Sequence, residues 1–99
     1  MNKYSKNYLD KISSSKVYDV AIKSPITKAE SVSSQFSNNI FLKREDLQPT
    51  HSFKIRGAYN KISNLVEKEN AKHVVTASAG NHAQGVAYSC LLYTSDAAD

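Results

Sequence analysis

The clearest periodic pattern in the chain lies between Ile55 and Val66. Apolar residues recur there at spacings of three and four, which places them on one face of an α-helix. They are Ile55, Ala58, Tyr59, Ile62, Leu65 and Val66. Ser52 precedes the run, and a serine hydroxyl is well suited to cap a first helical turn. The pattern predicts an amphipathic helix that starts after Ser52 and ends in the charged stretch "EKENAK".

Short apolar runs flank this helix on both sides. "IFLK" at 40–43 is brief and partly β-branched, and "HVVTASA" at 73–79 follows the charged stretch. Both are typical of strands. Helical spacing then returns in "GNHAQGVAYS" at 80–89. The resulting order, strand–helix–strand–helix, favours an α/β fold with a parallel sheet and flanking helices.

The first 39 residues predict weaker elements. The apolar positions within 8–12 have helical spacing, and "SPIT" at 24–27 marks a break. Pro25 fixes its own φ and pushes the preceding residue out of the helical region. "KAESVSSQF" at 28–36 predicts a short helix. Glu45 follows in a polar loop, where we expect a solvated acid.

Composition narrows the class of protein. The chain has 99 residues, of which 40% are hydrophobic and 22% charged, so one small globular domain is expected and wholesale disorder is not. The net charge of +4 comes mainly from scattered lysines. Because no run of five basic residues occurs, a nucleic-acid binder has little support.

The single cysteine and the N-terminus exclude further classes. Cys90 alone can form neither an intramolecular disulfide nor a cysteine-based zinc site. The N-terminus has no apolar signal-like region, and no segment approaches the roughly 20 apolar residues of a membrane helix. The sequence therefore predicts a soluble, cytoplasmic protein without a membrane partner.

The last ten residues, "CLLYTSDAAD", differ from the rest. They contain no lysine or arginine, although the chain has 13. "TSD" continues a helix poorly, and the stretch resembles the translation of a sequencing-library adapter. We expect that the natural protein continues past Ser89 and that residues 90–99 are a non-native tail.

Lys54 lies just beyond the edge of the apolar arc of the predicted helix. Partial burial and the positive end of a helix dipole both favour the neutral form of an amine. A neutral amine is a nucleophile that can form a Schiff base with an aldehyde. The alternative is a snorkelling lysine, whose stem covers the core while its head reaches water. From position alone, snorkelling is the commoner outcome.

A second candidate site is "TASAGNHAQG" at 76–85, where a predicted strand gives way to a helix near Asn81. Free N–H groups at a helix start bind anions, and the small residues at 78–80 allow a close approach. In open parallel sheets, ligands bind at this carboxyl end of a strand. The alternative is a plain turn capped by Asn81. His82 has no second ligand nearby, so no metal site is expected.

The two motifs together resemble a family. "HSFKIRGAY" followed by "TASAGNHAQGVA" is similar to the threonine dehydratases (threonine ammonia-lyases), pyridoxal-phosphate enzymes of fold type II, the tryptophan synthase β-like fold. The likeness extends through "LKREDLQPTHSFKIRGAYNKI" and "SKVYDVAIKSPI", and covers Tyr8 to Ser89. The threonine–histidine pair before "SFK" resembles the biosynthetic branch of the family.

The resemblance implies an activity and roles for particular residues. Lys54 would carry pyridoxal 5'-phosphate and remove the α-proton, Phe53 would lie against the cofactor ring, and Asn81 would bond its hydroxyl. The substrate carboxylate would be held by Ser78, Ala79, Gly80, Asn81 and His82. The reaction would be deamination of L-threonine to 2-oxobutanoate and ammonia, the first step of isoleucine biosynthesis, in a homo-oligomer.

The resemblance also shows what the chain lacks. Its three glycines, Gly57, Gly80 and Gly85, are not clustered, so the family's glycine-rich phosphate loop is not among these residues. Residues 1–89 would then be the N-terminal portion of the catalytic domain, and the 99-residue chain would neither hold the cofactor stably nor turn over threonine. Alternatives are a serine/threonine racemase or serine dehydratase acting on L-serine, or a non-catalytic relative.

Overall fold

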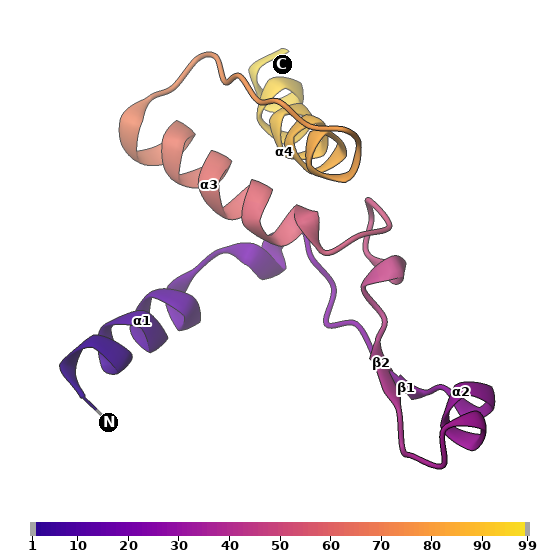
Figure 1. Ribbon diagram of the computed structural model, residues 1–99. Helices are drawn as coiled ribbons and strands as arrows, with labels where there is room; N and C mark the ends of the chain where they lie inside the picture. Colours follow the sequence, from indigo (N-terminus) through magenta and orange to yellow (C-terminus); the bar gives the residue numbers. More distant parts are fainter. Residues whose placement is uncertain (1, 99) are drawn as a thin grey trace.

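The computed structural model describes residues 2–98. Among these residues, the helices and strands are α1 (Lys3–Ser14), β1 (Ile26–Lys28), α2 (Glu30–Gln35), β2 (Phe41–Lys43), α3 (Lys54–Glu69) and α4 (Asn81–Ala98), with 3-10 turns η1 (Val17–Asp19) and η2 (Glu45–Leu47). Helices α3 and α4 pack together, α1 extends to one side, and the β1–α2–β2 unit projects away from them (Figure 1).

The amphipathic helix predicted from the apolar spacing is confirmed as α3. Its buried apolar residues, which form the centre of the small core, are Ile55, Ala58, Tyr59 and Ile62. The helix ends at Asn70, which adopts the left-handed conformation (φ 54°) and donates its N–H to Leu65 O. Asparagine is one of the few residues that tolerate this conformation, so a sequence-local signal ends the helix.

The start of α3 differs slightly from the prediction. Phe53, not Ser52, occupies the capping position, and its side chain makes no capping bond. The Ser52 hydroxyl instead accepts a hydrogen bond from the Lys54 N–H at 3.3 Å. The buried Ser52 thus satisfies one of the free N–H groups of the helix start, although it lies one residue further out.

Helix α4 begins at Asn81 as predicted and crosses α3 at Gly85. A Cβ atom added at Gly85 would lie 3.1 Å from Ala58 Cβ and 3.2 Å from the Lys54 carbonyl oxygen. Gly85 is buried, and its missing side chain lets the two helix backbones approach closely. The contact brings the first turn of α4 toward the first turn of α3.

This close approach gives a prediction with an internal control. Gly85→Ala is expected to destabilise the fold by about 1–2 kcal/mol, because crowding the Lys54 backbone outweighs the helix-propensity gain of roughly 1 kcal/mol. Gly57 lies within α3 with no atom within 4 Å of an added Cβ, so Gly57→Ala should stabilise by about 0.5–1 kcal/mol. Urea unfolding of the two variants measures both signs. Stabilisation by Gly85→Ala would contradict the close packing.

The strand predicted at 40–43 is confirmed as β2, but the second predicted strand is not seen. Strand β2 pairs antiparallel with β1, with Ile26 opposite Lys43 and Lys28 opposite Phe41. Residues 73–79 form no strand, and Val75 is 99% exposed. A strand needs a hydrogen-bonded neighbour, and none of the described residues provides one. The only sheet within residues 2–98 is therefore this antiparallel pair.

The weaker predictions at both ends have mixed outcomes. Helices α1 and α2 are present where the N-terminal patterns indicated them.

The break expected at "TSD" is wrong, since α4 runs on to Ala98. Thr94 donates its hydroxyl to the Cys90 carbonyl at 2.9 Å, and Tyr93 donates to Glu67 on α3 at 3.1 Å. The Tyr93–Glu67 bond joins this part of α4 to α3, whereas the Thr94–Cys90 bond lies within α4 itself. Within the described residues, no helix is long and apolar enough to cross a membrane.

Candidate active site

Lys54 is the first residue of α3 and its side chain is half-buried. Its Nζ lies 5.2 Å from the centroid of the Phe53 ring, within the range of a cation–π contact. Phe53 is 58% exposed, so one amine and one aromatic ring lie together at the helix start. The structure thus brings two of the predicted site residues into contact.

The turn before Lys54 is tightly built. Gln48, Thr50 and Ser52 are buried, and the His51 N–H donates to Gln48 O at 2.8 Å. His51 has φ 59°, in the left-handed region that non-glycine residues rarely adopt. The Thr50 hydroxyl is buried and has no hydrogen-bond partner among the described residues. Such a closely packed turn leaves little freedom in where α3 begins.

The start of α4 is capped by a residue that the sequence did not single out for this task. The Ser78 hydroxyl accepts hydrogen bonds from the Gly80 and Ala83 N–H groups, both at 3.1 Å. The cap is therefore Ser78 and not Asn81, as the plain-turn alternative had it. Within residues 2–98, the N–H groups of Asn81 and His82 have no acceptor. With the helix dipole, they form a place that favours a carboxylate or phosphate.

The two predicted site segments lie near each other. Asn81 precedes Gly85 by about one helical turn, and a Cβ added at Gly85 would lie 3.2 Å from the Lys54 carbonyl oxygen. The turn before α4 and the start of α3 face the same region in Figure 1. Asn81 is exposed, while His82 and Gly80 are half-buried, so the segment at 78–82 borders an open surface on this side.

The site at Lys54 is separate from the hollow between α1 and α3. That hollow has a volume of about 400 Å³ and is lined by Tyr8, Lys11, Ile12, Ser15, Val17, Tyr18, Arg56, Gly57 and Asn60. Arg56 lines this hollow and Lys54 does not, so the two side chains lie on different flanks of α3. Neither Lys54 nor residues 78–82 line this hollow.

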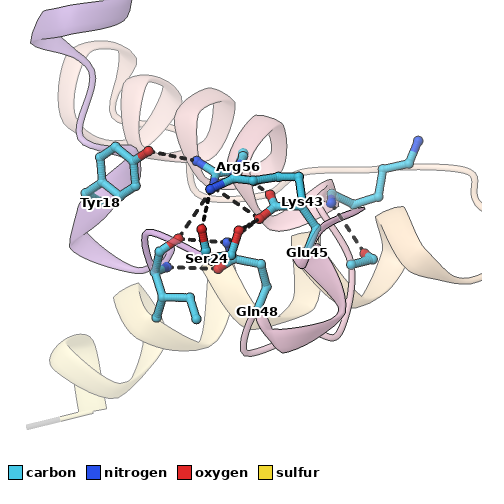
Figure 2. A network of polar contacts seen from close by, with 9 residues as sticks. Tyr18, Ser24, Lys43, Glu45, Gln48 and Arg56 are labelled. Carbon is cyan, nitrogen blue, oxygen red and sulfur yellow. Dashed lines mark hydrogen bonds and ion pairs between the residues drawn. The ribbon is translucent and has the colours of Figure 1, made fainter. Parts of the chain in front are cut away.

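A polar network that sequence reasoning missed surrounds Glu45 (Figure 2). Glu45 is not a solvated acid, because its side chain is only 17% exposed and forms an ion pair with the Arg56 Nε. Ser24 donates to the same carboxylate at 2.5 Å and Gln48 donates at 2.9 Å. The sequence feature that could have indicated this network is Arg56, which lies outside the apolar face of α3 and whose charge requires a partner.

The network strongly favours the ionised form of Glu45. The hydrogen bond from Arg56 is the main cause that lowers the pKa of Glu45, to about 2, and burial opposes it. Ser24 and Gln48 lower this pKa further by hydrogen bonding to the charged form. In turn, Glu45 and then Tyr18 raise the pKa of Arg56.

The fold and these residues define a class of protein. The chain matches the family described as pyridoxal-phosphate dependent enzyme over residues 17–97, and it belongs to that family. It is similar to "Threonine dehydratase 1 biosynthetic, chloroplastic" of Solanum lycopersicum, with 57% identity over 82 residues, which are 83% of this chain and 14% of that protein. "L-threonine dehydratase biosynthetic IlvA" of Escherichia coli (strain K12) is 52% identical over 82 residues, covering 83% of this chain and 16% of its own length.

A solved structure is also similar. It is the processed form of threonine deaminase isoform 2 from Solanum lycopersicum, with a TM-score of 0.77 and 52% sequence identity. The match covers 90% of this chain and 25% of that one. The chain thus has the fold of the N-terminal part of a type II pyridoxal-phosphate enzyme, and it spans only a small share of its relatives' length.

The described residues fit one end of pyridoxal phosphate. The Lys54 amine suits its aldehyde, the exposed Phe53 face suits its ring, and the exposed Asn81 amide suits a ring substituent. The phosphate end requires several closely spaced N–H groups, and the glycines of the chain are not clustered into such a loop. The fit therefore concerns the reacting end of the cofactor.

Proposed function

We propose that the protein containing this chain deaminates L-threonine to 2-oxobutanoate and ammonia with pyridoxal phosphate, as the first step of isoleucine biosynthesis. The observation that supports it is the half-buried Lys54 at the start of α3, next to Phe53 and to the open start of α4. The names of the relatives, biosynthetic threonine dehydratases, support the choice of substrate.

Each residue has a task in this proposal. The Lys54 amine would hold the cofactor through its aldehyde, and the same amine would take the α-proton of the substrate. When bound, pyridoxal phosphate withdraws electrons from the α-carbon, which makes loss of this proton and of the β-hydroxyl feasible. Phe53 would lie against the ring of the bound cofactor, and Asn81 would bond the ring hydroxyl. The turn Ser78–Ala79–Gly80–Asn81–His82 holds the substrate carboxylate through its N–H groups and so orients the α-carbon toward Lys54.

We further propose that residues 1–89 are the N-terminal portion of a longer catalytic domain and that 90–99 are a non-native tail. In the complete domain, the exposed segment 73–79 would join a parallel sheet and the phosphate loop would come from elsewhere in the protein. The full exposure of Val75 and the small share of the relatives that the chain spans support the longer domain. The lack of lysine and arginine in residues 90–99 supports the tail. A homo-oligomer is proposed as well. The cytoplasmic location stays a prediction, because plant relatives are named chloroplastic.

Borohydride reduction tests the proposal directly. Pyridoxal phosphate added to the full-length protein and then reduced is expected to leave a pyridoxyl group on Lys54, detected by peptide mass spectrometry. The 99-residue chain treated in the same way should show no preference for Lys54 over Lys61, which is exposed on the same helix. A full-length protein whose Lys54 stays unlabelled would refute the proposed function.

A further inference from the structure

Helix α3 is tied to the preceding loop by one ion pair close to its start. Arg56, two residues after Lys54, donates its Nε to Glu45 Oε1 and its Nη2 to Glu45 Oε2 at 3.2 Å. The side chains of Arg56 and Glu45 are 26% and 17% exposed. A two-pronged arginine–carboxylate contact that is mostly shielded from water fixes orientation as well as distance.

Gln48 extends this link to the N-terminal segment. Its side-chain amide accepts from the Ile22 N–H and donates to the Ile22 carbonyl, both at 2.8 Å. The same amide nitrogen donates to Glu45, and Ser24 donates to Glu45 as well. Gln48 is 1% exposed, so water cannot replace the hydrogen bonds of its side chain. The polar atoms of the network therefore depend on one another for partners.

The network encloses the turn that carries Lys54. Gln48 stands at one end of this turn and Arg56 lies just beyond the other, and the Ser52 hydroxyl holds the Lys54 N–H between them. Arg56 and Lys54 lie on different flanks of α3. Glu45 therefore acts on Lys54 through the helix backbone and not by direct contact with the amine. Any rotation of the first turn that moves Arg56 must also move Lys54.

We propose that Glu45 and Arg56 are positioning residues for Lys54: their ion pair, supported by Gln48 and Ser24, sets the rotation of the first turn of α3 and so where the amine stands. This inference rests on the proposed function of Lys54. Without Glu45, the shielded Arg56 guanidinium loses its carboxylate and turns toward water, since an unpaired charge is poorly tolerated there. A misplacement of about 1 Å at a reacting group can lower a rate roughly 100-fold.

The neighbouring ion pair provides a matched control. Arg44 and Asp46 belong to the same loop and make two hydrogen bonds at 2.9 and 2.8 Å. Their side chains are 34% and 57% exposed, and neither is bonded to α3 among the described residues. Asp46→Asn removes a charge from the same loop without releasing the helix start.

The test compares Glu45→Ala, Glu45→Gln and Asp46→Asn in the full-length protein. We expect Glu45→Ala to lower kcat for threonine by about 100-fold, with KM changing less than about threefold. The share of borohydride-fixed pyridoxyl on Lys54, relative to Lys61, should fall about tenfold. Glu45→Gln keeps the shape and one acceptor for Arg56, so it should lie between wild type and Glu45→Ala. Asp46→Asn should change neither readout by more than about twofold, since exposed pairs contribute little.

The outcomes separate the two proposals. Circular dichroism shows whether each variant is folded at the assay temperature; if Glu45→Ala is not, Glu45→Gln carries the comparison. A folded variant with wild-type kcat and wild-type labelling of Lys54 would overturn the positioning role. An equal loss of kcat in Glu45→Gln and Asp46→Asn would also overturn it. Each variant removes one negative charge from the loop, so the loss would then follow from the charge and not from the link to α3. If wild-type Lys54 is itself unlabelled, the proposed function fails instead.

Discussion

Replacing Lys54 by alanine in the full-length protein is expected to lower threonine deamination by at least about 1,000-fold. General base catalysis by one positioned side chain contributes roughly 100- to 10,000-fold, and Lys54 would also supply the covalent attachment of the cofactor. No other amine begins α3 next to an exposed aromatic ring, so no neighbour can replace it. Formation of 2-oxobutanoate at saturating threonine measures the loss.

Lys61→Ala is the control for this substitution. Lys61 lies on α3, is exposed, and lines neither the turn at 78–82 nor the network around Glu45. It should therefore keep wild-type activity. If Lys54→Ala retained more than about a tenth of wild-type kcat, Lys54 would not be the general base. The wild-type protein could instead racemise L-serine and form no 2-oxobutanoate from threonine. That result would identify the full-length protein as a racemase.

Acidification is expected to destabilise the fold through Glu45. Its pKa lies at about 2 in the folded protein, against an ordinary value of 4.5, because Arg56, Ser24 and Gln48 bond its ionised form. A lowered pKa means that the contribution is fully present above pH 4.5 and is lost as the pH falls toward 2. The difference corresponds to roughly 3 kcal/mol before the partial exposure of the pair is considered, and solvent screening lowers it to about 2 kcal/mol.

Urea unfolding at a series of pH values between neutral and acidic measures this effect. Because other carboxylates also titrate in this range, the informative quantity is the difference between wild type and Glu45→Gln. That difference should be largest near neutral pH and shrink as the wild-type carboxylate takes up a proton. A pH-independent difference would mean that the charge of Glu45 contributes nothing to stability. Asp46→Asn, on the exposed pair, should give a smaller pH-dependent difference.

Much of the candidate site could be predicted from the sequence because its signals are local. The spacing of apolar residues around Ile55 defined α3 and placed Lys54 at the edge of its buried face. The small residues before Asn81 indicated a helix start that is open to anions. The two motifs together identified the family, which the comparison over residues 17–97 shows.

Strand pairing and polar partners could not be predicted in this way, because they depend on residues distant in the sequence. The segment at 73–79 has the composition of a strand, yet it forms none where no neighbour offers hydrogen bonds. Glu45 has the composition of a surface acid, yet folding places it between Arg56, Ser24 and Gln48. How far a side chain is removed from water, and which charge it pairs with, depend on residues that only folding brings together.

The sequence by itself determined the helix that carries Lys54, the turn before α4 and the family to which the chain belongs. The tertiary structure alone decided that α3 and α4 meet at Gly85, and that the first turn of α3 is held by an ion pair to the preceding loop. The physical reason is that periodicity and capping act over a few residues along the chain. Helix contact and charge pairing depend on distances in space, which only the folded chain sets.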